Sequence, residues 1–334
     1  MYQEFRHFGV IGAGAWGTAL AVSLLRAGRE ATLWAHAPDV AKTINASHEN
    51  SIHLPGVKLD PQLKAVTDLA ELAGCSAWVL ATPAQHVRSI CQQLAQVADD
   101  NTAPVIITAK GIEQNTCALL SEIVAAELPR HPLAVLSGPS FAREVIDGKP
   151  TALTLATKYK ALGEELATAL ATPSLRLYRT DDVAGAQIGG AIKNVLAVAC
   201  GIVSGRVFGD NARAAIITRG LAEMMRLGRA LGAKPETLTG LSGIGDLVLT
   251  CSSDRSRNTS LGIALGQGQA LADILATRTS VTEGVTTASA AHALAQKHHV
   301  DMPIVAAVDA ILNHKADIDR TIAQLLARPL RTEG

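Results

Sequence analysis

The chain has 334 residues, a length that suggests about two domains of ordinary size. Hydrophobic residues make up 48% of it and charged residues 18%, which is enough to bury a large core and excludes a disordered chain. The formal net charge is zero, so the composition indicates neither a nucleic-acid partner nor an acidic membrane partner.

The cysteines indicate a reducing compartment. They are odd in number and none has metal-ligand spacing: Cys75, Cys91, Cys117, Cys200 and Cys251. We therefore expect reduced thiols in a cytoplasmic protein and no metal site. No signal peptide precedes the first strand-like run, and no uninterrupted apolar stretch reaches the ~18 residues of a membrane span. The sequence predicts no stable membrane insertion.

The first half of the chain alternates short apolar runs with helical segments. The runs typical of buried strands cover residues 8–14, 30–36, 76–83, 103–111, 131–139 and 151–157. A helix is predicted over 17–28, ending at Gly28. Continuous apolar strands separated by helices indicate an α/β fold with a parallel sheet that is covered on both faces.

A glycine-rich turn joins the first strand to the first helix. Gly12, Gly14 and Gly17 have the spacing G-x-G-x-x-G, which permits a tight turn, close approach to a pyrophosphate and close helix–strand packing. The helix N-terminus adds free N–H groups and a positive dipole end. We therefore expect a Rossmann-type dinucleotide site that includes Ala15 and Trp16. For Trp16, simple packing over the loop is the alternative.

The end of the second strand usually distinguishes NAD from NADP. An acidic residue there accepts a hydrogen bond from the ribose 2′-hydroxyl and repels a 2′-phosphate. This chain has His36 at about that place, and Asp39 follows several residues later. Because His36 can donate to a phosphate, we hypothesise that NADPH is accepted, with NADH as a second cofactor. An exposed His36 without any ligand contact is the alternative.

Beyond about residue 185 the pattern becomes helical. Helical periodicity runs through residues 188–202, 212–232, 260–276, 287–299 and 303–313. The sequence therefore predicts a Rossmann domain over residues 1–183 and an all-helical substrate and catalytic domain over residues 184–334. By the usual rule for such sheets, the active site lies in the cleft between them.

Two polar residues interrupt the most apolar of these helices. Lys193 and Asn194 lie within GGAIKNVLAVACG, and an isolated lysine in such a helix usually extends its amine to water. Here Asn194 is adjacent, and Gly189 and Gly190 lie one turn earlier, which we interpret as room for a ligand. A lysine in a dry cleft has a lowered pKa and can transfer a proton near neutral pH.

These motifs together resemble a known family, the bacterial-type NAD(P)-dependent glycerol-3-phosphate dehydrogenases. The resemblance rests on GGAIKNVLAVACG with GIGDLVLTC (243–251) and SRN (256–258), and it extends to GAGAWGTALA, TAKGI, SGPSFA, TRGLAEM and VTEG. It covers almost the whole chain. The resemblance implies reversible reduction of dihydroxyacetone phosphate to sn-glycerol 3-phosphate for phospholipid synthesis, in a cytoplasmic homodimer.

The resemblance also implies roles for individual residues. Lys193 is expected to be the general acid/base, and Lys110 to contact substrate and cofactor. The residues expected to orient Lys193 and the substrate are Asp246, Asn194 and Thr250. Those expected to hold the substrate are Gly138, Ser140, Ser256, Arg257 and Asn258. Those expected to touch the cofactor, besides the glycine turn and His36, are Ala142, Arg257, Val281 and Glu283.

The sequence differs from the family pattern at one helix end, and it leaves two alternative functions. Family members often have an acidic residue where this chain has Ser204, followed after a glycine by Arg206, so we expect the contacts at this helix end to differ from the family pattern. The enzymatic rival is the β-hydroxyacid and 6-phosphogluconate dehydrogenase group, in which the lysine and asparagine are separated along the helix. The other rival is a non-catalytic NAD(P)-sensing protein, which would not need Lys193, Asp246 and Arg257 together.

Overall fold

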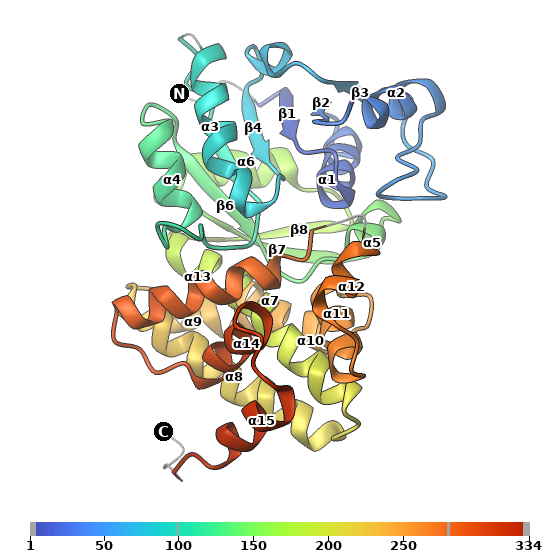
Figure 1. Cartoon of the computed structure of the whole chain (residues 1–334). Coiled ribbons are helices and arrows are strands. Elements are labelled where there is room, and N and C mark those ends of the chain that lie inside the picture. Colours follow the sequence, from blue (N-terminus) through green and yellow to red (C-terminus); the bar gives the residue numbers. More distant parts are fainter. Residues whose placement is uncertain (1–4, 99, 279–280, 330–334) are drawn as a thin grey trace.

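The computed structural model describes residues 5–98, 100–278 and 281–329. Figure 1 shows a sheet flanked by helices, with a second layer of helices packed against one of its ends. The sheet has eight strands in the order β3-β2-β1-β4-β5-β6-β7-β8. The bounds of the strands are β1 His7–Ile11, β2 Glu30–Trp34, β3 Lys64–Val66, β4 Ala77–Leu80, β5 Val105–Ile107, β6 Leu133–Ser137, β7 Thr151–Ala156 and β8 Leu175–Thr180.

The strands β1 to β6 pair in parallel, and the predicted α/β fold class is confirmed. The expectation of a wholly parallel sheet needs one correction, because β7 runs antiparallel to β6. The connection between them contains a single helix of five residues, α5 (Ala142–Ile146). Such a helix is too short to carry the chain back along the sheet, as a parallel crossover requires. The strands β3 and β8 were missed, because β3 is very short and β8 is largely exposed.

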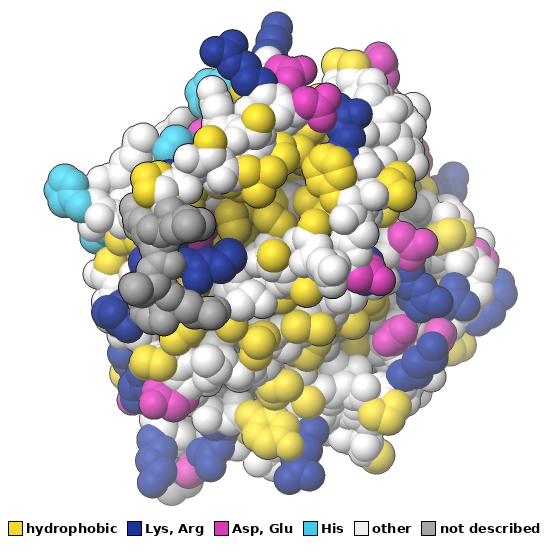
Figure 2. All heavy atoms as spheres, turned by 90° about the horizontal axis from the view of Figure 1, so that it is seen from below, with side chains coloured by type: hydrophobic (Ala, Val, Ile, Leu, Met, Phe, Trp, Pro, Cys, Tyr) yellow, Lys and Arg dark blue, Asp and Glu magenta, His cyan; other side chains and the backbone are white. Residues whose placement is uncertain are grey.

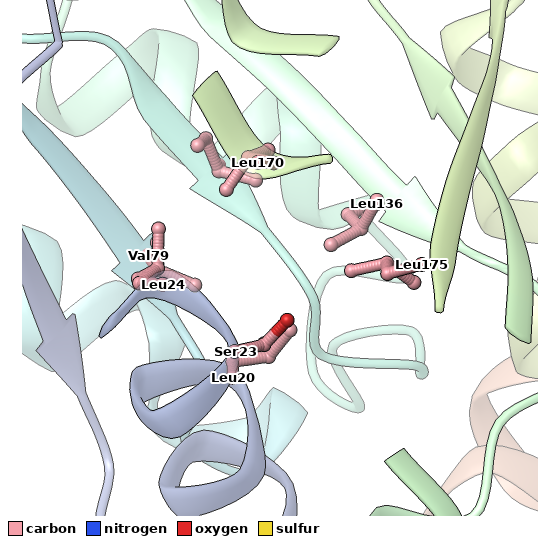
Figure 3. A pocket seen from close by; sticks show the side chains of 8 residues that line it. Leu20, Ser23, Leu24, Val79, Leu136, Leu170 and Leu175 are labelled. Carbon is pink, nitrogen blue, oxygen red and sulfur yellow. The ribbon is translucent and has the colours of Figure 1, made fainter. Parts of the chain in front are cut away.

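Helices cover both faces of the sheet. On one face lie α1 (Ala15–Arg26), α2 (Pro38–Ser47), α5 and α6 (Lys160–Leu170), which share one apolar core with the strands. On the other face lie α3 (Val87–Val97) and α4 (Leu120–Glu127). Alternate strand residues serve the two cores: Phe8 and Val10 of β1 face the first, and Ile11 faces the second. A small apolar cavity remains between α1 and the sheet (Figure 3).

The second half of the chain is helical throughout the residues that the structure describes. Its elements are α7 Val183–Gly205, α8 Asp210–Ala230, α9 Pro235–Leu238, the π-helical turn η3 Leu241–Gly245, α10 Asp246–Cys251, α11 Arg257–Gly266, α12 Leu271–Ala276, α13 Glu283–Lys297, α14 Pro303–Asn313 and α15 Ile318–Leu326. The single helix expected over 260–276 is therefore wrong. It breaks into α11 and α12 around Gly268, whose φ of +90° does not fit a right-handed helix.

Helix α7 is the central element of this half. It is long and apolar enough to cross a membrane, but 89% of its most apolar window is buried inside the protein, as in the core helix of a globular fold. The backbone of the neighbouring helix α11 packs directly against the backbone of α7. A Cβ added to Gly201 of α7 would lie 2.2 Å from the carbonyl oxygen of Thr259, and one added to Gly262 of α11 would lie 2.2 Å from that of Val198. Glycines on both helices thus permit a contact that no larger residue allows.

We expect Gly262→Ala to lower the free energy of unfolding by about 1–3 kcal/mol, because the new methyl group must push α11 away from α7. Gly74→Ala is the matched control, since nothing lies within 4 Å of the Cβ it would add. That control should change stability by no more than ~0.5 kcal/mol. Urea denaturation of the three proteins measures both values, and equal stability of all three would contradict the interpretation of the α7–α11 contact.

Candidate active site

The carboxyl ends of four neighbouring strands meet at one edge of the sheet, and three of them carry residues that the sequence singled out. Gly12 follows β1, Thr82 follows β4, Lys110 follows β5 and Gly138 follows β6. Parallel strands end at the same edge of a sheet, so these positions lie side by side where ligands bind in open α/β sheets. The helix α7 packs against β6 at this edge, which brings Lys193 to the same place.

The glycine turn has the geometry of a phosphate cradle. Gly12 has a φ of +116°, and a Cβ there would lie 2.8 Å from the carbonyl carbon of Ala81. A Cβ on Gly17 would lie 1.9 Å from the carbonyl oxygen of Gly12. In the part of the chain that the structure describes, nothing lies within 4 Å of a Cβ added to Gly14, and no side chain caps the N-terminus of α1. The first N–H groups of α1 therefore face open space, which fits a dinucleotide pyrophosphate.

The other residues expected around the cofactor are less enclosed. Ala15 and Trp16 are half-buried at the start of α1, and the indole Nε1 of Trp16 is buried with no partner among the described residues. Ala142 is half-buried at the start of α5. His36 is exposed beyond β2, with its ring centroid 5.9 Å from that of Trp34. Its position leaves the imidazole free to meet a ribose or a phosphate.

A buried carboxylate between two lysines forms the centre of the site. Lys193 Nζ donates to Asp246 Oδ1 over 2.6 Å, and Lys110 Nζ donates to Asp246 Oδ2 over 2.6 Å. Lys110 Nζ also donates to the carbonyl oxygen of Gly138 over 2.9 Å. The side chain of Asp246 is 1% exposed and that of Lys193 is 9% exposed. One carboxylate thus joins α7, α10 and the segment after β5.

The pKa of Lys193 is lowered to about 8. Burial is the largest cause, because it disfavours the charged amine, and the positive charge of Lys110 acts in the same direction. Asp246 opposes both by attraction and by its hydrogen bond. The result is an amine that carries its proton at neutral pH and can release it close to that pH.

Polar side chains hold the two lysines in place. Thr250 Oγ1 accepts from Lys193 Nζ over 3.0 Å. Asn194 Nδ2 donates to the carbonyl oxygen of Lys110 over 3.0 Å, and Asn258 Nδ2 donates to Asn194 Oδ1 over 2.9 Å. Gly284 N in turn donates to Asn258 Oδ1 over 2.9 Å. This row of bonds joins the segment after β5 to α7, α11 and α13.

The glycines beside Lys193 require a correction. The room that we expected for a ligand at Gly189 and Gly190 is filled by protein. A Cβ on Gly189 would lie 2.1 Å from the carbonyl oxygen of Ser242, and one on Gly190 would lie 3.0 Å from Ser137 Oγ and 3.2 Å from Lys110 Cγ. These residues are small because η3 and the stem of Lys110 pack on the helix at these positions.

The SRN segment begins helix α11. Ser256 Oγ caps the helix by accepting from Thr259 N, and Asn258 is buried. The side chain of Arg257 is exposed, and among the described residues no carboxylate pairs with it. Burial raises the pKa of Glu283, and the positive charge of Arg257 is one of the smaller effects that oppose this rise. Burial lowers the pKa of His53, and the charge of Arg257 adds to that lowering. The guanidinium therefore lies at the mouth of the site, free to meet an anion.

Two further expected residues lie at the start of α13. Glu283 Oε1 accepts from Ala84 N over 2.9 Å, so a carboxylate of the helical half caps the turn after β4. Burial raises the pKa of Glu283, while the bond from Ala84 and the positive charges nearby lower it. Val281 is exposed. On the substrate side, Ser140 is half-buried and its Oγ donates to the carbonyl oxygen of Gly138 over 3.2 Å.

His53 is a residue that the sequence did not indicate. It lies in the loop after α2, and its pKa is lowered first by burial and then by the charge of Arg257 from the helical half. No motif surrounds it, so only the folded chain brings it to the site. The structure also defines the contacts of Ser204 and Arg206 at the end of α7. Ser204 Oγ donates to the carbonyl oxygen of Cys200, and Arg206 pairs with Asp319 over 2.9 Å, which ties the end of α7 to α15.

A dinucleotide-type sheet whose strand ends meet a buried lysine–aspartate–lysine cluster defines a two-domain nicotinamide-nucleotide oxidoreductase. Residues 7–163 match the N-terminal domain, and residues 182–323 the C-terminal domain, of the NAD-dependent glycerol-3-phosphate dehydrogenases. The chain belongs to this family.

Close relatives extend over the whole chain. It is 56% identical to the glycerol-3-phosphate dehydrogenase [NAD(P)+] of Rhodospirillum rubrum, covering 100% of this chain and 96% of the relative. It is 52% identical to that of Caulobacter vibrioides, covering 99% and 100%. The crystal structure of glycerol-3-phosphate dehydrogenase from Coxiella burnetii superposes with a TM-score of 0.93 at 38% identity, covering 97% of this chain and 99% of that one.

Proposed function

We propose that this protein is an NAD(P)-dependent sn-glycerol-3-phosphate dehydrogenase that interconverts dihydroxyacetone phosphate and sn-glycerol 3-phosphate. The observation that carries the proposal is the buried cluster of Lys193, Asp246 and Lys110 beside an uncapped glycine turn. A proton donor next to a dinucleotide site is what reduction of a ketone requires. The family to which the chain belongs selects the substrate.

The residues around the turn suit a nicotinamide dinucleotide, NADPH or NADH. Gly12, Gly14 and Gly17 with the start of α1 would hold its pyrophosphate, with Ala15 and Trp16 beside them. The side chains assigned to its other parts are His36, Lys110, Ala142, Arg257, Val281 and Glu283. The cofactor, when bound, supplies and accepts the hydride. The absence of an acidic side chain directly after β2, together with the exposed His36, favours NADPH.

Lys193 is proposed as the general acid/base. With its pKa at about 8, the amine is mostly protonated at pH 7 and can give a proton to the carbonyl oxygen as this oxygen becomes a hydroxyl. In the oxidative direction the neutral amine takes the proton back. Asp246 and Thr250 hold the amine, Asn194 holds the backbone of Lys110, and Lys110 adds a second positive charge for the substrate.

The phosphate of the substrate supplies most of the binding, since a triose offers little apolar area. Ser256, Arg257 and Asn258 are proposed as its clamp, and Gly138 and Ser140 as the opposite wall. Each charge-assisted hydrogen bond contributes ~1.5–3 kcal/mol. The guanidinium of Arg257 is exposed and pairs with no carboxylate of the described residues, which suits this role because binding then breaks none of the ion pairs found there.

The remaining assignments complete the proposal. We place the domain boundary between residues 183 and 184, at the start of α7. The protein is proposed to be cytoplasmic, without stable membrane insertion or nucleic-acid partner, and to supply glycerophospholipid synthesis. Its five cysteines are free thiols in the structure, in keeping with a reducing compartment.

A homodimer through the helical half is also proposed. An apolar groove lies between α7, α8, α14 and α15, lined by residues that include Ile216, Ile311 and Ile322. Near it Leu326 is 80% exposed, and Val207 of the α7–α8 turn is 86% exposed. Figure 2 shows hydrophobic side chains spread over this face of the molecule, with Lys and Arg among them. Exposed apolar surface of this kind is typical of a protein interface.

Purified protein should reduce dihydroxyacetone phosphate with NADPH at a kcat/KM at least equal to that with NADH. Steady-state kinetics with each reduced nucleotide measure this ratio. A kcat/KM about tenfold higher for NADH would overturn the cofactor preference. Turnover of 3-hydroxy acids in place of the phosphorylated ketose would favour the β-hydroxyacid dehydrogenase group, and no turnover of any phosphorylated ketose would favour a sensing protein.

Lys193→Ala should lower kcat by ~10²–10⁴-fold, because the developing oxyanion loses its proton donor. NADPH should still bind, which a fluorescence titration measures. Lys64→Ala is the matched control, since Lys64 pairs with Glu71 at the β3 edge. Near-normal turnover of Lys193→Ala would refute the assigned role.

Arg257→Ala should raise the KM for dihydroxyacetone phosphate by about 10- to 100-fold, the equivalent of one charge-assisted bond, with a smaller change in kcat. Arg179→Ala is the control, because Arg179 pairs with Glu164 at the far edge of the sheet. An unchanged KM in the Arg257 variant would remove the SRN segment from the phosphate site.

A further inference from the structure

The segment that carries Lys110 is held in place by an ion pair outside the site, between Arg88 and Glu113, which we call the Arg88–Glu113 clamp. This segment, residues 108–119, joins β5 to α4. It belongs to the sheet domain by sequence, but Ile112 and Leu119 are buried in the core of the helical half. A short antiparallel bridge between the same two residues closes it into a loop. The loop is therefore the part of the sheet domain that enters the other domain, and Lys110 lies at its entrance.

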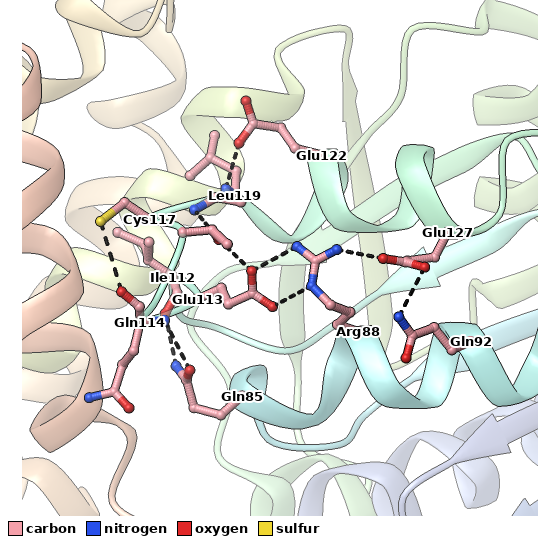
Figure 4. Close-up of polar contacts among 12 residues, drawn as sticks. Gln85, Arg88, Gln92, Ile112, Glu113, Gln114, Cys117, Leu119, Glu122 and Glu127 are labelled. Carbon is pink, nitrogen blue, oxygen red and sulfur yellow. Dashed lines mark hydrogen bonds and ion pairs between the residues drawn. The ribbon is translucent and has the colours of Figure 1, made fainter.

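Arg88 of α3 binds Glu113 of this loop from the side away from the site (Figure 4). Its Nε donates to Glu113 Oε1 over 2.8 Å and its Nη2 to Glu113 Oε2 over 2.7 Å, a two-point contact that fixes both position and orientation. Its Nη1 donates to Glu127 Oε1 of α4. The Glu113 side chain is only 12% exposed, and Arg88 holds the pKa of that carboxyl below its usual value. Partial burial makes this pair stronger than an open surface pair.

Gln85 adds two bonds next to the clamp. Its Nε2 donates to the carbonyl oxygen of Ile112 over 2.8 Å, and its Oε1 accepts from Gln114 N over 3.0 Å. Gln85 follows Ala84, whose N–H is held by Glu283. From the other side, Gln114 Nε2 donates to Ser289 Oγ of α13 over 3.2 Å. The loop, the turn after β4 and the start of α13 thus form one junction.

We propose that Arg88 and Glu113 form a positioning pair for the reaction: they hold the loop so that the amine of Lys110 stays on Asp246. Neither residue is among those assigned to the substrate or cofactor. The bidentate contact lies three residues from Lys110 along the chain. This inference rests on the proposed function, because it concerns the frame of the proposed proton donor.

The pair should affect chemistry through the charges around Lys193. The positive charge of Lys110 lowers the pKa of Lys193, and Lys110 shares Asp246 with it. If the loop relaxes and Lys110 leaves Asp246, the repulsion weakens and Asp246 attracts Lys193 alone. Both changes raise the pKa of Lys193. A variant without the clamp should therefore keep its proton donor charged to higher pH than the wild type does.

The test measures the pH profile of kcat/KM for dihydroxyacetone phosphate reduction. The wild-type profile should fall above about pH 8, where Lys193 loses its proton. Arg88→Met and Glu113→Gln should each lower kcat about tenfold by misplacing Lys110 and move this limb to higher pH by about half a unit or more. The double variant should be no worse than either single variant, since both remove the same contact.

Two controls separate positioning from general stability. Glu127→Gln removes the other partner of Arg88, which lies on α4 and not on the loop, and should leave the limb in place. Arg179→Met removes an ion pair elsewhere in the same domain. Thermal unfolding of all variants reports stability independently. Clamp variants that lose only melting temperature, with an unmoved limb, would overturn the proposal. A wild-type protein that shows no activity on dihydroxyacetone phosphate would instead overturn the proposed function.

Discussion

The structure depends on one carboxylate placed between two amines. Asp246 accepts from Lys193 with one oxygen and from Lys110 with the other, and its side chain is almost wholly buried. Asp246 and Lys193 depend on each other in this buried position, because removing one partner of a buried ion pair costs ~3–5 kcal/mol. The same contact joins α10 and α7 of the helical half to the loop after β5. The same hydrogen bonds therefore serve both the arrangement of the two halves and the chemistry of the site.

Close helix packing makes that contact possible. The lysine lies on α7, and glycines let α11 and η3 approach its backbone to distances that any Cβ would prevent. Asn194 and Asn258 meet across the α7–α11 contact, and their bonds continue to Lys110 and Gly284. The SRN segment at the start of α11 is thereby fixed relative to the amine of Lys193. The small residues in these helices therefore determine the distances between functional groups as well as the packing of the core.

The sequence predicted what local chemistry determines. The glycine turn, the fold class and the polar pair in α7 follow from spacing and periodicity, and the resemblance brought Asp246 and Lys110 into the same site. The sequence did not predict that β7 runs antiparallel, because this depends on the length of the connection from β6. It also did not predict the break near Gly268, which depends on the φ angle of that residue. It misjudged Gly189 and Gly190, because the atoms that fill their space come from distant segments. His53 and Arg88 carry no motif, so only the folded chain places them.

Acid–base behaviour at this site is a balance and not a property of one residue. Burial and Lys110 lower the pKa of Lys193, whereas Asp246 raises it, and the sum lies at about 8. Burial is set by the packing of α7, and the position of Lys110 by a loop that reaches into the helical half. Any shift between the two halves changes all three contributions at once. The fold therefore tunes the pKa of the Lys193 amine through distances, and elements remote from that amine can influence the pH at which it releases its proton.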